Sequence, residues 1–235
     1  MRRLERRDGV PVPPAIETAA SASAPEPGRK VWRLWGVEFD PRIAQIVVAG
    51  TTILLIAFDN HFVQAEYDHF FLEFLIPVGI IVLAWREDPR RFGLRLGDWR
   101  LGLPIAIGSI AVMAVAIWYV SRLTDIHAYY APVAGGRSTL RLAIDSGVDM
   151  FAWEFFFRGW TLTTLGRRYG ADAIWLQVVP FALMHIGKPE LEQLTTVLGG
   201  AFFGIVAWRT NSFLWGWLLH WFMVTWVVMV AAGYV

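Results

Sequence analysis

The sequence predicts an all-α fold, a polytopic integral membrane helix bundle of about seven transmembrane helices. Two features of composition predict this class. Of the 235 residues, 56% are hydrophobic and only 17% are charged, whereas soluble domains carry about 25% charged residues. The chain also has 13 tryptophans, whose rings suit the membrane–water interface. It has no cysteine, which excludes a disulfide-stapled secreted module and a zinc ribbon.

Residues 1–40 differ from the rest of the chain. They begin with the basic run MRRLERR and continue with a stretch rich in Pro, Ala and Ser, so we expect a disordered tail. No continuous apolar run follows the first arginines, which argues against a secretory signal peptide. In RKVWRLWGVEF, residues 29–39, aromatic and basic side chains alternate. That pattern predicts a short segment on the membrane surface, and a plain linker is the alternative.

From residue 43 onward, apolar runs alternate with short charged joints. Crossing the bilayer core takes about 20 helical residues. The first, fifth and sixth runs are short, and the fourth contains charges. The predicted spans are 43–58, 70–85, 101–121, 140–165, 173–186, 194–208 and 213–235. We expect N-terminal transmembrane helices over 41–138 and a core that carries the candidate site over 139–235.

The basic residues predict the orientation. Arginines are frequent in the tail and in the joint REDPRRFGLRLGDWR at 86–100, and positive charges favour the cytoplasmic side. We therefore expect a cytoplasmic N-terminus in a bacterial plasma membrane. Attraction to anionic lipid headgroups explains these basic clusters, so the expected partner is the lipid bilayer and not a nucleic acid.

Ionisable residues inside the spans are the candidate site. Each costs several kcal/mol unless it is paired or hydrated. Glu154 and Arg158 lie four residues apart in FAWEFFFRGW, which places them on one helix face. His185 ends the fifth span and His220 lies inside the seventh. At 1.5 Å per residue, antiparallel helices bring these groups to similar depth, so we expect them to converge around a cavity open to water. Taken singly, the ion pair could be structural and each histidine could serve only as a cap or a backbone hydrogen-bond donor.

The runs EFFFRG at 154–159 and FALMH at 181–185, followed by His220, resemble the motifs of the CPBP family. These are intramembrane endopeptidases of the CAAX-protease and bacteriocin-processing type, including the type II CAAX prenyl endopeptidases. The resemblance covers roughly 140–225. Two positions depart from the family pattern: Trp153 stands where the first of two adjacent glutamates is usual, and Val224 stands where asparagine or aspartate is usual.

The resemblance implies an intramembrane endopeptidase that hydrolyses a peptide bond in or near the membrane, acting on a peptide or membrane-protein substrate. Glu154 would act as general base on a water molecule, and Arg158 would hold it ionised. His185 would position the water or protonate the leaving amine, and His220 would donate a hydrogen bond to the oxyanion.

The cofactor remains open. Glu154, His185 and His220 are a possible zinc ligand set, and the family is often described as metalloprotease-like. Glu154 cannot readily be both ligand and base, although Glu190 or Glu192 could supply a second carboxylate. We therefore expect a metal-independent mechanism, with zinc as the alternative.

Two other function classes compete with the protease. One is a catalytically inactive CPBP-like membrane protein, such as an immunity factor or scaffold. The other is a small ion-coupled transporter, for which the sequence offers no paired repeat halves. As scaffold, we expect an ion ladder of Arg141, Asp145 and Asp149, and a small-residue stripe of Thr196, Gly200 and Gly204. His61, His69 and His127 receive no predicted role.

Overall fold

A computed structural model describes residues 32–34, 37–39, 44–61 and 68–235. The tail predicted to be disordered therefore lies almost entirely outside the described residues. Within 32–39, strands β1 (Trp32–Leu34) and β2 (Val37–Phe39) pair antiparallel, with Trp32 opposite Phe39. The rest of the described chain is helical.

Helices occupy all seven of the predicted spans. The first is α2 (Ala44–His61), and the second joins η1 (Phe70–Leu75), α3 (Ile76–Gly79) and η2 (Ile80–Ala84). The third is α4 (Trp99–Val120), and the fourth joins α6 (Thr139–Glu154), η5 (Phe155–Thr161) and α7 (Leu162–Tyr169). The last three are α8 (Ala173–Leu183), α9 (Glu190–Thr210) and α10 (Leu214–Ala231). Four short elements lie in the joints: η3 (Pro89–Phe92), α5 (Thr124–Tyr130), η4 (Ala131–Ala134) and η6 (Gly170–Asp172).

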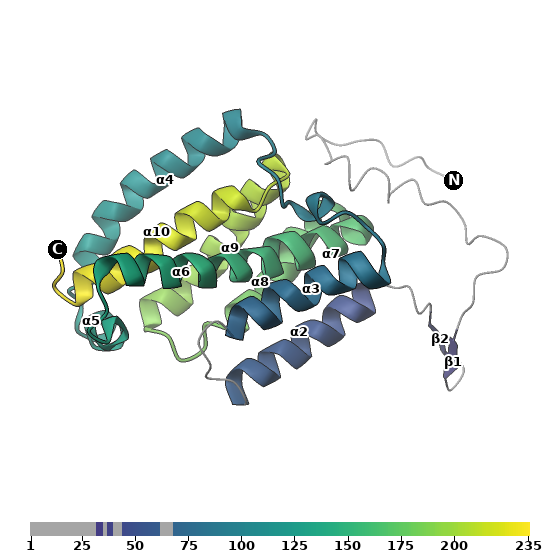
Figure 1. Cartoon of the computed structure of the whole chain (residues 1–235), viewed down its shortest axis with the longest axis horizontal. Coiled ribbons are helices and arrows are strands. Elements are labelled where there is room, and N and C mark those ends of the chain that lie inside the picture. Colours follow the sequence, from purple (N-terminus) through teal and green to yellow (C-terminus); the bar gives the residue numbers. More distant parts are fainter. Residues whose placement is uncertain (1–31, 35–36, 40–43, 62–67) are drawn as a thin grey trace.

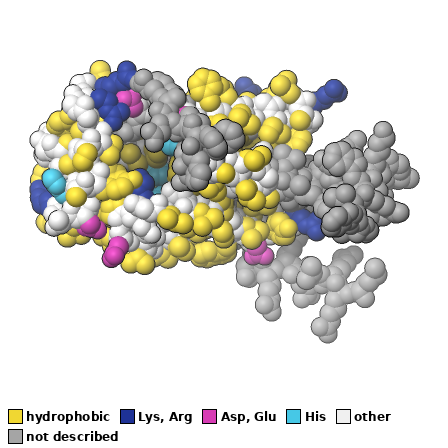
Figure 2. Space-filling model, turned by 90° about the horizontal axis from the view of Figure 1, so that it is seen from below, with side chains coloured by type: hydrophobic (Ala, Val, Ile, Leu, Met, Phe, Trp, Pro, Cys, Tyr) yellow, Lys and Arg dark blue, Asp and Glu magenta, His cyan; other side chains and the backbone are white. Residues whose placement is uncertain are grey.

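By length and composition, α4, α9 and α10 are long and apolar enough to cross a membrane. The apolar segments Val48–Ala57 and Phe70–Ala84 are shorter. The membrane helix bundle is thus confirmed as the fold class. On α4, the large side chains Ile107, Val112 and Val115 are exposed, as expected for a surface that faces lipid. Figure 2 shows hydrophobic side chains over much of the described surface on one face of the bundle.

Helix α10 lies between α4 and α6 and contacts both, as well as α9 (Figure 1). Helices α8 and α9 pack against each other, and α9 also contacts η5. The last helix therefore contacts α6, which is the first part of the fourth span, and α9, which contacts the middle of that span. This arrangement brings residues of α10 close to the end of α6.

The middle of the fourth span is a π-helix. In η5, the backbone N–H of Leu162 donates to the carbonyl of Phe157, five residues earlier. Phe155, Phe156 and Phe157 are all buried, with at most 1% of each exposed. All seven residues of η5 are buried, so η5 runs through the interior. Wide π turns inside α-helices occur frequently at functional sites.

A close approach of the joints fixes one end of the bundle. Gly97 has a φ of +58°, and its neighbour Asp98 donates its backbone N–H to the carbonyl of Thr210 at 2.8 Å. A side chain at Gly97 would collide with that carbonyl. Asp98 then caps α4 by accepting a hydrogen bond from the N–H of Leu101 at 3.2 Å. The joint before α4 and the end of α9 are thereby held together.

Candidate active site

Glu154 and Arg158 form an ion pair in the interior of the bundle. Nη1 of Arg158 donates to Oε1 of Glu154 at 3.0 Å, and neither side chain has any exposed surface. The guanidinium also lies over the ring of Phe181, 4.1 Å from its centroid, and 5.1 Å from that of Phe203. These rings partly replace the water that burial removes from the cation. The predicted i, i+4 pair is present.

His220 reaches the same carboxylate oxygen from α10. Its Nδ1–H donates to Oε1 of Glu154 at 2.7 Å, and its ring stacks on Phe203. Oε1 therefore accepts two hydrogen bonds, whereas Oε2 is buried without a partner among the described residues. A Cβ added at Gly216 would lie 3.2 Å from Oε2, so this glycine leaves room beside the free oxygen.

His185 lies in the same region but does not bind Glu154 directly. Its Nδ1–H donates to the carbonyl of Phe181 at 2.7 Å, and its ring centroid lies 4.6 Å from that of Phe181. The Phe181 ring is also 6.2 Å from the His220 ring. The two histidines thus share the Phe181 ring as a neighbour. We expected all three side chains to converge, and contact is found only between Glu154 and His220.

Trp153 fills the space beside His185. The two ring centroids are 5.9 Å apart in an edge-on arrangement, and the Trp153 ring also contacts Phe157 and Phe181. Its Nε1–H is buried without a hydrogen-bond partner among the described residues. A large apolar ring therefore occupies the place of the first glutamate in the motif that this chain resembles.

Trp153 also packs against an acid–base pair that the sequence analysis missed. His69, 5.6 Å from the Trp153 ring between centroids, is hydrogen-bonded through Nδ1 to Oδ1 of Asp149. The predicted ion ladder is therefore only partly correct, since Arg141 and also Arg137 pair with Asp145. The four-residue spacing indicated one helix face, but it could not reveal a partner from a different helix.

The predicted zinc ligands do not fit a metal site. Within the part of the chain that the structure describes, no three side chains of His, Asp or Glu gather to hold an ion. Oε1 of Glu154 is already engaged by two donors. Glu192 instead accepts a hydrogen bond from the hydroxyl of Tyr130 at 2.6 Å, and burial together with this carboxylate raises the pKa of Tyr130.

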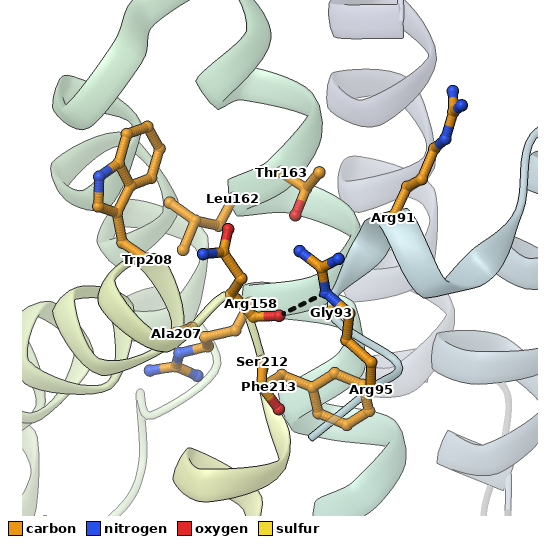
Figure 3. Close-up of a pocket in the computed structure, with 11 residues that line it drawn as sticks. Arg91, Gly93, Arg95, Arg158, Leu162, Thr163, Ala207, Trp208, Ser212 and Phe213 are labelled. Carbon is orange, nitrogen blue, oxygen red and sulfur yellow. Dashed lines mark hydrogen bonds between the residues drawn. The ribbon is translucent and has the colours of Figure 1, made fainter. Parts of the chain in front are cut away.

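A cavity of about 30 Å³ lies where the 89–97 joint, η5, α7 and the turn after α9 meet (Figure 3). Arg95 lines it and donates Nε–H to the carbonyl of Asn211 at 3.1 Å. Arg158 also lines it, along with Thr163 and Ser212, whereas Glu154 does not. The volume is sufficient for one or two water molecules, but it is not the expected cavity around Glu154 and the histidines.

The fold is a membrane helix bundle, and its interior holds a cluster of a glutamate, an arginine and a histidine. These features define an intramembrane protein whose buried side chains can act in acid–base chemistry. Residues 137–226 match the family model described as type II CAAX prenyl endopeptidase Rce1-like. This match confirms the family resemblance that the three motifs indicate, and it includes Glu154, Arg158, His185 and His220. No curated protein and no solved structure matches the chain.

Proposed function

We propose that the chain is an intramembrane endopeptidase that hydrolyses a peptide bond of a peptide or membrane protein in or near the bilayer. The observation that carries this proposal is the fully buried Glu154 carboxylate, bonded by Arg158 from its own helix and His220 from another. A buried ion pair adds little stability compared with apolar packing. Such a cluster inside a match to the Rce1-like family is therefore better explained by chemistry.

In the proposed mechanism, Oε2 of Glu154 accepts the proton of a water molecule as the water oxygen attacks the peptide carbonyl carbon. Oε2 suits this role because Oε1 is already occupied by Arg158 and His220. Arg158 orients the carboxylate through its hydrogen bond to Oε1. His220 supports the carboxylate through Nδ1 rather than serving as the primary oxyanion donor. His185, whose Nδ1–H is engaged by the Phe181 carbonyl, presents Nε2 to position the water.

The complete burial of Glu154 adds a requirement to this mechanism. Water and substrate must reach a carboxylate that has no exposed surface. We propose that substrate binding opens a path past Trp153, because this ring packs against His185 and also against His69, whose side chain and that of Asp149 are partly exposed.

A catalytically inactive scaffold is the second candidate. It is favoured by Trp153, which replaces a carboxylate of the family motif with an apolar ring. Hydrolysis separates the two candidates directly. Purified protein in lipid vesicles is incubated with a library of membrane-inserted peptides, and the products are read by mass spectrometry. The protease proposal expects cleavage that Glu154→Gln abolishes and Glu190→Gln, at an exposed position, leaves unchanged. Absence of cleavage across the library contradicts it.

We also propose that the N-terminus is cytoplasmic and that the membrane is a bacterial plasma membrane. The arginine-rich joint at 86–100 supports this orientation. Since the chain has no cysteine, single cysteines at the exposed positions Arg90 and Asp125 can be labelled with an impermeant maleimide in whole cells. Labelling of Asp125→Cys but not of Arg90→Cys is expected, and the reverse pattern contradicts the orientation.

A further inference from the structure

The contact between His69 and Asp149 joins two spans at one end of the candidate site. His69 occupies the N-cap position of η1, and Asp149 lies in α6, where its Oδ1 accepts the Nδ1–H of His69. Carboxylate binding at Nδ1 fixes the ring tautomer and stabilises the imidazolium when it forms. The remaining ring nitrogen, Nε2, is then the atom that can give up or take a proton.

This pair adjoins the candidate site through Trp153. Asp149 lies one helical turn before Trp153 on the same face of α6, and His69 and His185 both pack edge-on against the Trp153 ring. At the position where the family motif has its first glutamate, this chain therefore has the indole ring of Trp153. His69 and His185, which come from two other segments, both lie beside that ring. Among the described residues, His69 with its partner Asp149 and His185 are proton-exchanging groups beside this position.

The pair differs from Glu154 in its access to water. The side chains of His69 and Asp149 are 23% and 37% exposed, whereas those of Glu154 and Arg158 have no exposed surface. A partly exposed carboxylate within a membrane protein faces water rather than lipid, because lipid exposure of a charge costs several kcal/mol. His69 can therefore exchange protons with bulk water directly, whereas the buried cluster exchanges them only through the path that substrate binding opens.

We propose that His69, oriented by Asp149, is the proton donor to the leaving amine in the hydrolysis proposed above, on which this inference rests. Glu154 removes a proton from water while the water oxygen bonds to the carbonyl carbon. When the tetrahedral intermediate collapses, the C–N bond breaks and its electron pair takes the proton from Nε2 of His69. His69 then regains a proton from bulk water, and Glu154 returns its proton to bulk water. The net reaction consumes one water per peptide bond.

His185 is less suited to this donor role. Its Nδ1–H donates to a neutral backbone carbonyl, and a carbonyl stabilises an imidazolium less than a carboxylate does. Of the two histidines beside Trp153, His69 is bonded to a carboxylate, that of Asp149, and His185 is bonded to a backbone carbonyl. This division assigns water positioning to His185 and protonation of the amine to His69.

The test compares two leaving groups on one acyl sequence, a peptide amide and a p-nitrophenyl ester. An amine must be protonated to leave, whereas p-nitrophenolate leaves without a proton. His69→Gln keeps a donor for Asp149 but cannot deliver a proton. We expect it to lower kcat for the amide about 100-fold and kcat for the ester less than about threefold. Asp149→Asn should likewise lower kcat for the amide more than kcat for the ester. His127→Gln, at an exposed histidine of another joint, is the matched control and should change neither.

A merely structural contact gives a different result, because a misfolded or loosened site lowers both activities equally. Equal losses for amide and ester in His69→Gln, or no loss in either, overturn the inference. Glu154→Gln separates this failure from failure of the proposed function. If Glu154→Gln abolishes both activities while His69→Gln spares the amide, the protease stands and the donor assignment is wrong. If the wild-type chain cleaves neither substrate, both are overturned.

Discussion

His220 and Glu154 are joined by a 2.7 Å hydrogen bond, although they are 66 residues apart in the chain. The bond links α10 to the end of α6 and ends on the same oxygen that Arg158 binds. One oxygen of the carboxylate is thereby fixed by two donors and the other is left without a partner among the described residues. The following predictions test this asymmetry and the residues that enclose it.

Removing one partner of the buried ion pair should cost more stability than removing both. Glu154→Leu leaves the Arg158 cation buried without its carboxylate and should destabilise the protein by about 3–5 kcal/mol. Combining it with Arg158→Leu should recover at least about 2 kcal/mol, because apolar replacement of a whole pair is often neutral. Equilibrium unfolding in mixed micelles measures both variants. A double variant that is less stable than Glu154→Leu would show that the pair itself stabilises the bundle.

Neighbouring glycines of α9 provide a matched test of packing around the site. A Cβ at Gly200 would come within 2.9 Å of the Phe181 ring, whereas a Cβ at Gly199 meets nothing within 4 Å. Phe181 contacts Arg158, His185 and His220. Gly200→Ala should therefore lower the free energy of unfolding by about 1–3 kcal/mol and reduce hydrolysis. Gly199→Ala should keep full activity and gain up to about 1 kcal/mol from helix propensity. Equal effects of the two substitutions would contradict this account.

Trp153→Glu should introduce the second carboxylate that the family motif usually has. The new side chain would lie beside His185 and His69, and we expect peptide hydrolysis to rise about tenfold through a second general base. Loss of the buried indole should cost about 3–5 kcal/mol of stability. Initial rates at saturating peptide, measured below the unfolding temperature, separate the two effects. Trp153→Phe is the control, and a rate for Trp153→Glu below that of Trp153→Phe refutes the prediction.

Chelators should leave hydrolysis nearly unchanged. The mechanism proposed here uses Glu154 as a base, and its Oε1 is held by Arg158 and His220 rather than by donors arranged for a metal. Incubation with 1,10-phenanthroline should retain activity within about twofold, whereas a catalytic zinc would be withdrawn. A zinc peptidase in the same detergent serves as the positive control. Loss of activity that added zinc restores would establish a metal mechanism instead.

The fold and the central cluster could be largely predicted because they follow from local rules. Apolar runs locate the helices, and the i, i+4 spacing locates the pair of Glu154 and Arg158. Depth arithmetic predicted that His185 lies level with Glu154 and His220 somewhat less deep, whereas the direct contact is with His220. The role of Phe181 as the ring between the two histidines could not be obtained in this way, because it depends on how α8 faces η5.

Two further features escaped the sequence analysis for related reasons. Asp149 follows Asp145 by four residues, which suggested a continuous ladder, but its partner His69 comes from another segment whose register the sequence leaves open. The pairing of residues 32–34 with 37–39 is the other feature, since alternating aromatic and basic side chains indicate an amphipathic segment without specifying strand or helix.

The π-helix η5 lets this region lose one residue at a place where an α-helix could not. Its wide turn contains one residue more than an α-helical turn would, so a single deletion within Phe155–Thr161 would convert it to ordinary α-helix. The helices on either side would keep their faces, because the wide turn is what takes up the extra residue. A single deletion in α7 before Arg167, where there is no wide turn, would instead rotate every later residue by about 100° around the helix axis relative to those before it. Arg167, whose two terminal nitrogens each lie 2.6 Å from the carboxylate of Glu87, would keep its partner in the first case and leave it in the second. The fourth span therefore has one place where its length can change without separating its two ends from each other.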